Sequence, residues 1–117
     1  WEEALGWYET AMGIARSTSQ GELASMIGVG VANIRLHKGD LPAARRLYDS
    51  AARSGTPEAE ARGYAGLMLV ATQEGDLNEA RRFGWQALRR AESDDDRTMV
   101  LGGLAHVFLG LGLVNEA

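Results

Sequence analysis

Residues 39–51 read GDLPAARRLYDSA, and most of this stretch returns 36 residues later as GDLNEARRFGWQA at residues 75–87. A weaker copy, GLVNEA, follows at residues 112–117. The spacing of the small and aromatic residues in the first copy also occurs near the start of the chain, at Ala4, Tyr8 and Ala11. The sequence is therefore that of a repeat protein, in which each unit is stabilised by stacking on its neighbours.

Apolar residues recur every three or four positions along the chain, a pattern that predicts amphipathic helices. We expect six antiparallel helices and a carboxyl-terminal stub after Gly112, with the helices at about 1–16, 21–38, 41–53, 57–74, 77–91 and from 94 onward. No segment alternates apolar and polar residues with a period of two, so no strand is expected. The predicted fold class is all-α.

The ends of the expected helices carry residues that start or stop helices. A side-chain oxygen at the N-cap can accept a hydrogen bond from a free backbone N–H of the first turn, and we expect such caps at Ser19 (with Glu22), Asp40, Thr56 and Asp76. A glycine ends a helix readily because it tolerates a positive φ. We expect inter-helix turns at Gly39, Gly55 and Gly75.

Composition narrows the class of protein. The chain has 117 residues, 45% of them hydrophobic, which is enough for one domain with a continuous core. It has no cysteine, which excludes disulfides and thiolate chemistry, fits a reducing compartment and leads us to expect a cytoplasmic protein. The apolar runs are short and the net charge is −4, so neither a membrane span nor nucleic-acid binding is expected. Because the chain starts at Trp1 and stops where a helix is expected to begin, we expect it to be a fragment of a longer polypeptide.

The helix pairs and their period resemble the tetratricopeptide repeat, in the longer variants found in large bacterial signalling proteins and transcription activators. The matching positions are Gly28, Val31, Ala32, Arg35, Ala44, Tyr48 and Ala51, then Tyr64, Leu67, Met68, Ala71, Ala80, Gly84 and Ala87, then Leu101, Leu104, Ala105, Phe108 and Ala117. Three of them, Gly28, Met68 and Gly84, differ from the family pattern, so the packing around them is expected to differ as well. The resemblance divides the chain into the second helix of a preceding repeat (1–20), two repeats (21–55 and 56–93) and an incomplete repeat (94–117).

The resemblance implies an α-solenoid that coils into a right-handed superhelix, with the first helix of each pair on the concave face. The concave face would bind a protein or peptide in a mostly apolar groove through Met26, Val29, Asn33, Leu36, His37, Arg62, Ala65, Leu69, Thr72, Gln73, Met99, His106 and Leu109. Chaperone-binding relatives hold a carboxylate with polar residues on this face. Here Asn33 matches one of those residues, but Val29, Gly66, Met99 and Gly103 stand at the other positions, so that activity is not expected.

Two other roles stay open from the sequence: a ligand- or partner-sensing regulatory segment of a bacterial transcription activator or signalling ATPase, and a self-association module that acts through the repeat ends. Apolar surface of Leu5, Tyr8, Leu104 and Phe108 is expected to be partly uncovered at those ends. No catalytic motif, phosphate-binding loop or metal-ligand spacing occurs, so we expect neither an enzyme nor a cofactor. The basic row that includes Arg46 and Arg82 fits a solvated surface better than a phosphate site. The run Asp94–Asp96 fits helix capping better than a cation site, and the two histidines fit surface residues better than metal ligands.

Ten of the fifteen glycines fall inside the expected helices. At about 0.5 to 1 kcal/mol each relative to alanine, they cost roughly 5 to 10 kcal/mol, comparable to the stability of a whole domain. Gly30, Gly66 and Gly103 occupy equivalent places in successive units. Close contact between helices is the first explanation and pliability of the superhelix the second.

Overall fold

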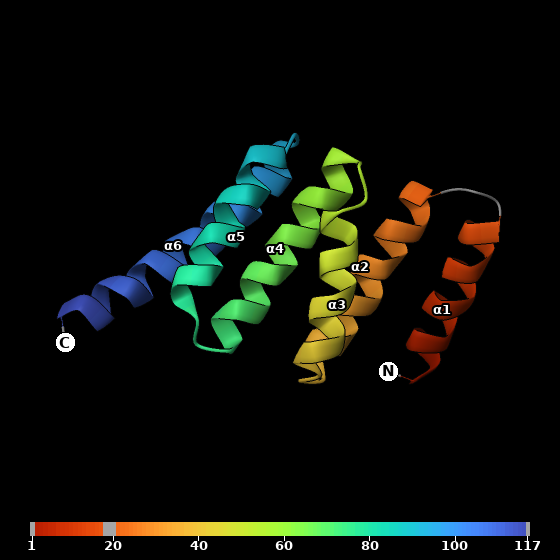
Figure 1. Cartoon of the computed structure of the whole chain (residues 1–117), viewed down its shortest axis with the longest axis horizontal. Coiled ribbons are helices and arrows are strands. Elements are labelled where there is room, and N and C mark those ends of the chain that lie inside the picture. The colour runs from red at the N-terminus through yellow and green to blue at the C-terminus, as the bar shows by residue number, and fades with distance from the viewer. Residues whose placement is uncertain (1, 18–20, 117) are drawn as a thin grey trace.

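The computed structural model describes the backbone of residues 2–17 and 21–116, and the side chains of residues 2–11 and 24–112. Within those ranges the chain is all-helical and contains no strand, as the sequence predicts. The helices are α1 (Glu2–Ser17), α2 (Gly21–His37), α3 (Leu41–Ala52), α4 (Pro57–Gln73), α5 (Leu77–Arg90) and α6 (Asp94–Glu116). Figure 1 shows that successive helices run in opposite directions. None of these helices has the length and apolarity that a membrane span requires.

The helices pack in a regular order along an elongated body of 52 × 29 × 20 Å. Each helix contacts the next one in the chain, and α4 also contacts both α2 and α6. Therefore α2, α4 and α6 are neighbours along one side, while α3 packs against α2 and α4, and α5 packs against α4 and α6. Three core clusters of the described residues lie along this arrangement: one contains Tyr48, one contains Met68 and one contains Leu5.

The turns between helices follow the sequence prediction. Gly39, Gly55 and Gly75 adopt positive φ angles of 82°, 89° and 83°, which only glycine adopts without strain. The carboxylate of Asp40 accepts a hydrogen bond from Ala43 N at 3.2 Å, and that of Asp76 accepts one from Glu79 N at 3.0 Å. These two caps explain why the repeated Gly-Asp-Leu sequence starts a helix at both places.

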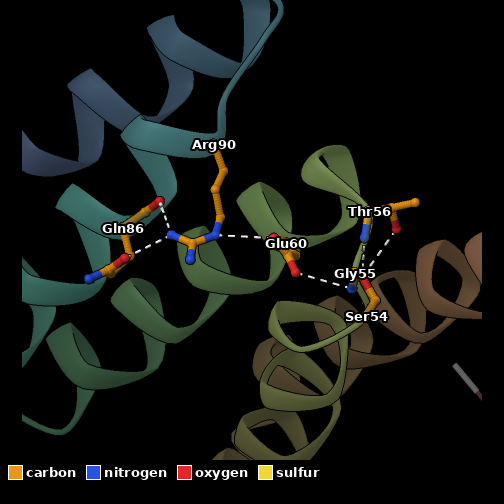
Figure 2. Close-up of polar contacts among 6 residues, drawn as sticks. All are labelled: Ser54, Gly55, Thr56, Glu60, Gln86 and Arg90. Atoms are coloured by element: carbon orange, nitrogen blue, oxygen red, sulfur yellow. Dashed lines mark hydrogen bonds and ion pairs between the residues drawn. The ribbon is translucent and has the colours of Figure 1, made fainter.

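The start of α4 differs from the prediction. Thr56 is the N-cap residue, but its side chain makes no capping hydrogen bond. Instead, Glu60 in the first turn accepts a hydrogen bond from Gly55 N at 3.1 Å and an ion-paired hydrogen bond from Arg90 Nε of α5 at 3.2 Å (Figure 2). The carboxylate thus links the α3–α4 turn to α5. The cap predicted at Ser19 lies outside the described residues.

The predicted carboxyl-terminal stub is wrong, because α6 is continuous from Asp94 to Glu116. At the two earlier junctions, glycine has a positive φ and the next residue is a capping aspartate. Gly112 is followed by a leucine, a residue type without the side-chain oxygen that could cap a new helix. Gly112 also lies within the helix rather than at a left-handed turn. The missing aspartate accounts for the difference.

The glycines at equivalent positions permit close contact between helices. A Cβ on Gly30 would lie 2.6 Å from the Tyr8 ring, and a Cβ on Gly66 would lie 2.1 Å from the ring of fully buried Tyr48. A Cβ on Gly103, the third member of the series, would likewise lie 2.3 Å from Met68 Cε. This finding confirms close helix contact as an explanation for these glycines.

In the second full unit, different residues fill the space that the Tyr48 ring fills in the first. Gly84 stands at the position of Tyr48, and the space left by the missing ring is filled by Leu104 and by Met68, which would lie 2.4 and 2.8 Å from a Cβ on Gly84. Leu104 is consequently buried, and Leu5 is buried against Val31 and Ile34 of α2. The expectation that Leu5 and Leu104 are partly uncovered is therefore wrong.

Candidate functional site

A hollow of about 240 Å³ opens among α2, α4 and α6. Its lining contains six residues that the sequence assigned to a binding face, together with two that it did not: Val29, Asn33, Arg62, Ala65, Gly66, Leu69, Asp96 and Met99. The volume is below that of typical small-molecule pockets, which hold roughly 300 to 1,000 Å³. It suits one or two side chains of a docked segment better than a whole ligand.

Two large apolar side chains in this hollow remain in contact with solvent. Leu69 of α4 is 45% exposed and Met99 of α6 is 52% exposed. Their neighbours Val29 and Ala65 are buried and form the floor of the hollow. Gly66 is part of the lining, and its missing side chain leaves room for the Tyr48 ring. Leu69 and Met99 therefore present apolar surface outside the core clusters, above a floor whose residues Val29 and Ala65 belong to them.

The charged groups of the hollow gather around Arg62. Its guanidinium lies 3.3 Å from a carboxylate oxygen of Glu58, one helical turn earlier, and 3.8 Å from one of Asp96 on α6. The Asp96 side chain is only 14% exposed. Arg62 and Asp96 line the hollow and Glu58 lies outside its lining, and the three groups together carry a formal charge of −1.

The polar group on the α2 side is Asn33, which is exposed and accepts a hydrogen bond from the Tyr48 hydroxyl. That bond uses one of the two lone pairs of the side-chain carbonyl oxygen and fixes which end of the amide is the oxygen, so the NH₂ end can donate to a ligand. Burial raises the pKa of Tyr48 to about 12. The tyrosine is therefore a neutral donor at physiological pH and fixes the orientation of the Asn33 amide.

The other residues assigned to the binding face do not line the hollow. Leu36 is buried in the core cluster around Tyr48, which corrects the expectation that it faces a groove. Thr72 donates its hydroxyl to the Met68 carbonyl oxygen at 2.7 Å. Met26 is half-buried, and the remaining four are exposed toward the helix ends or along α6: His37, Gln73, His106 and Leu109. Their role in binding stays a prediction.

Sequence reasoning missed Asp96 and Glu58. Asp96 belongs to an acidic helix start in the sequence, and it also precedes Met99 by three residues and therefore shares its helix face. Glu58 precedes Arg62 by four residues, the spacing of a helical ion pair. Helix spacing alone could thus have identified both carboxylates.

Other groups of polar side chains have structural partners. Arg45 of the outer basic row contacts Glu74 and Glu79, and the hydrogen bond with Glu74 raises the pKa of its guanidinium. Ser93 Oγ accepts a hydrogen bond from Asp96 N at 3.1 Å and so caps α6. Among the described residues, no group of three or more His, Asp or Glu side chains is arranged to hold a metal ion.

Comparison of the chain with protein-family models, with curated proteins and with solved structures found no significant match.

Proposed function

We propose that the chain is a tetratricopeptide-like α-solenoid, coiled as a right-handed superhelix, that binds a peptide or helical segment of another protein. The binding surface is the hollow among α2, α4 and α6. The partner segment carries an apolar side chain that enters the hollow and a lysine or arginine beside it.

The observation that carries this proposal is the exposure of Leu69 and Met99 inside a hollow with a buried apolar floor. An apolar side chain seated there removes both from water, and burying a residue of this size contributes about 1.5 to 3 kcal/mol. The volume of about 240 Å³ favours a side-chain anchor over a free small molecule.

The charges support a basic partner. Arg62 is already paired with Glu58 and Asp96, so an acidic ligand would have to compete with two carboxylates. A cation placed beside Asp96 would instead compensate the surplus negative charge. The amide NH₂ of Asn33 can donate to a backbone carbonyl of the segment, which would set its orientation.

Selection from a random peptide library on the immobilised chain tests this proposal. We expect the recovered peptides to share an apolar residue and a nearby lysine or arginine. Fluorescence anisotropy then gives the affinity of a labelled recovered peptide for two variants. Leu69→Asp should weaken binding at least ~30-fold, the scale of a hot spot, while the helical circular dichroism persists. Leu101→Asp is the matched control, because Leu101 is 51% exposed on α6 outside the hollow.

Asp96→Asn tests the charge preference separately. It should weaken a recovered basic peptide a few-fold, in line with about 1 kcal/mol for a partly exposed charge pair. Recovery of peptides with acidic residues, or of peptides that bind Leu69→Asp as tightly as the wild type, would contradict the proposed function.

A further inference from the structure

One face of α6 lacks a covering helix within the described structure. It is formed by Leu101, Ala105 and Phe108, and we call it the carboxyl-end face. Leu101 is 51% exposed and Phe108 is 43% exposed, although the Phe108 ring contacts that of Trp85 of α5 in an edge-to-face arrangement with ring centroids 6.1 Å apart. Two half-exposed apolar side chains on one helix face form a surface suited to another helix.

The first described helix has a matching open face. On α1, Glu3, Trp7 and Tyr8 are exposed, and Trp7 is the most exposed large hydrophobic side chain of the described residues at 78%. A depression of about 440 Å³ lies along the same helix beside Trp7. We call this surface the amino-end face.

The packing inside the molecule supplies the register between these faces. Tyr8 covers Gly30 as Tyr48 covers Gly66, so α1 is equivalent to α3, and by the repeat to α5. At the internal α4–α5 contact, Phe83 packs against Tyr64 with ring centroids 6.2 Å apart. Trp7 stands at the position of Phe83, and Leu101 stands at the position of Tyr64.

Charged and polar residues match in the same register. Inside the molecule, Arg45 of α3 contacts Glu79 of α5 at 3.0 Å. The equivalent residues at the two ends are Arg81 and Glu3, which are both exposed and have no ion-pair partner in the described part of the chain. The Tyr48 hydroxyl donates to Asn33, and the equivalent pair at the ends is Tyr8 and His106, whose imidazole has two ring nitrogens for a hydrogen bond with the hydroxyl.

From these equivalences we propose that a second copy of this chain docks head to tail, with its α1 on the carboxyl-end face of the first. Trp7 of one copy packs against Leu101 and Phe108 of the other, as Phe83 packs against Tyr64. Glu3 pairs with Arg81 across the contact. Because the two faces differ, each copy keeps one free face, and association continues beyond the dimer unless the ends meet.

Sedimentation velocity of the chain from micromolar to millimolar concentration tests the proposal. We expect the average mass to increase with concentration past that of a dimer. Trp7→Asp blocks one face and Leu101→Asp the other, and both side chains are exposed, so each variant should stay folded and largely monomeric. Each change should weaken association at least ~30-fold.

An equal mixture of these two variants should form a dimer and nothing larger, since each contributes one intact face. A wild type that stays monomeric throughout would overturn the proposal and indicate that another protein or segment covers these faces. A two-fold symmetric dimer, in which neither variant rescues the other, would overturn it as well.

A charge exchange provides a second test that does not alter the apolar faces. Glu3→Arg and Arg81→Glu should each weaken association by up to about 5-fold, and the double variant should recover the wild-type affinity because the pair is restored with opposite signs. Additive weakening in the double variant would contradict the proposed register. This test stays decisive if an aspartate variant fails to fold.

Discussion

Two sets of exposed side chains in this molecule differ in whether the equivalent residues of the other units are exposed as well. Asn33, Leu69 and His106 occupy equivalent positions in three successive units, and all three are exposed. Leu101 and Phe108 are exposed in the last unit, whereas their equivalents in the preceding unit are half-buried Tyr64 and fully buried Ala71. The first set is exposed wherever the unit occurs, and the second only where no further helix packs.

The difference separates two origins of exposed apolar surface in a helical repeat. A position that stays exposed in every unit keeps surface that the packed neighbouring helices leave uncovered, even where a hydrogen bond joins it to one of them, as at Asn33. A position that is covered in all units but the last belongs to the stacking surface. By this criterion our proposals assign Leu69 to a ligand surface and Leu101 to a contact between units, although the two leucines have nearly equal exposures of 45% and 51%.

The largest change in the free energy of unfolding is expected where the helices are in closest contact. Gly66→Ala places a Cβ 2.1 Å from the ring of Tyr48, which is fully buried and unable to withdraw. We expect a loss of about 3 kcal/mol or more in the free energy of unfolding, measured by urea titration. Gly102→Ala is the matched control, because a Cβ added at Gly102 has no neighbouring atom within 4 Å outside its own helix backbone. There alanine should gain about 0.5 to 1 kcal/mol, and equal losses at both positions would contradict the packing account.

A somewhat smaller loss of stability should distinguish Tyr64, which is covered by α5, from Leu101, which occupies the equivalent position on α6 and is uncovered. Tyr64 packs against Phe83, and Arg90 lies 4.7 Å from its ring centroid, so Tyr64→Ala should cost about 2 to 3 kcal/mol. Leu101→Ala at the equivalent place should change stability by no more than about 0.5 kcal/mol in dilute solution. Thermal melts of both variants give the comparison. Similar losses would mean that α6 is already covered in the isolated chain.

The next effect concerns alkaline stability. Burial raises the pKa of Tyr48 from 10.0 to about 12, so the folded state holds this proton more tightly than the unfolded state. The stabilisation is complete below pH 10 and is lost as the pH rises toward 12, amounting to roughly 2 kcal/mol. Urea titrations from pH 8 to 12 should show this decline in the wild type and a shallower one in Tyr48→Phe. Parallel profiles would show that Tyr48 is not the titrating group.

The all-helical fold and most helix boundaries could be predicted because local residues determine them. Asp40 and Asp76 cap the helices after Gly39 and Gly75, and these signals need no tertiary information. The predicted stub is wrong because GLVNEA at residues 112–117 shares Gly, Asn, Glu and Ala with GDLNEA at residues 75–80 but lacks the aspartate that starts a helix. A capping aspartate proved more informative than overall similarity between copies.

The candidate site was predictable only in part. Helix spacing identifies a face, but whether a residue on that face is open depends on neighbouring helices. Leu36 has the right spacing for the groove and is buried against α3, because α2 turns this side toward Tyr48. That Met68 fills the space left by the small Gly84 could not be predicted either, because the two residues lie on different helices and meet only in the folded chain. The sequence indicated only that both depart from the repeat.

The affinity of one selected peptide for Leu69→Asp and for Leu101→Asp, measured by fluorescence anisotropy at protein concentrations where the chain is monomeric, tests the distinction between the two surfaces most directly. The account predicts a loss of at least ~30-fold for Leu69→Asp and a change within about 2-fold for Leu101→Asp. An equal loss in both variants, or a greater loss in Leu101→Asp, would contradict it and assign partner binding to the end of the helix array.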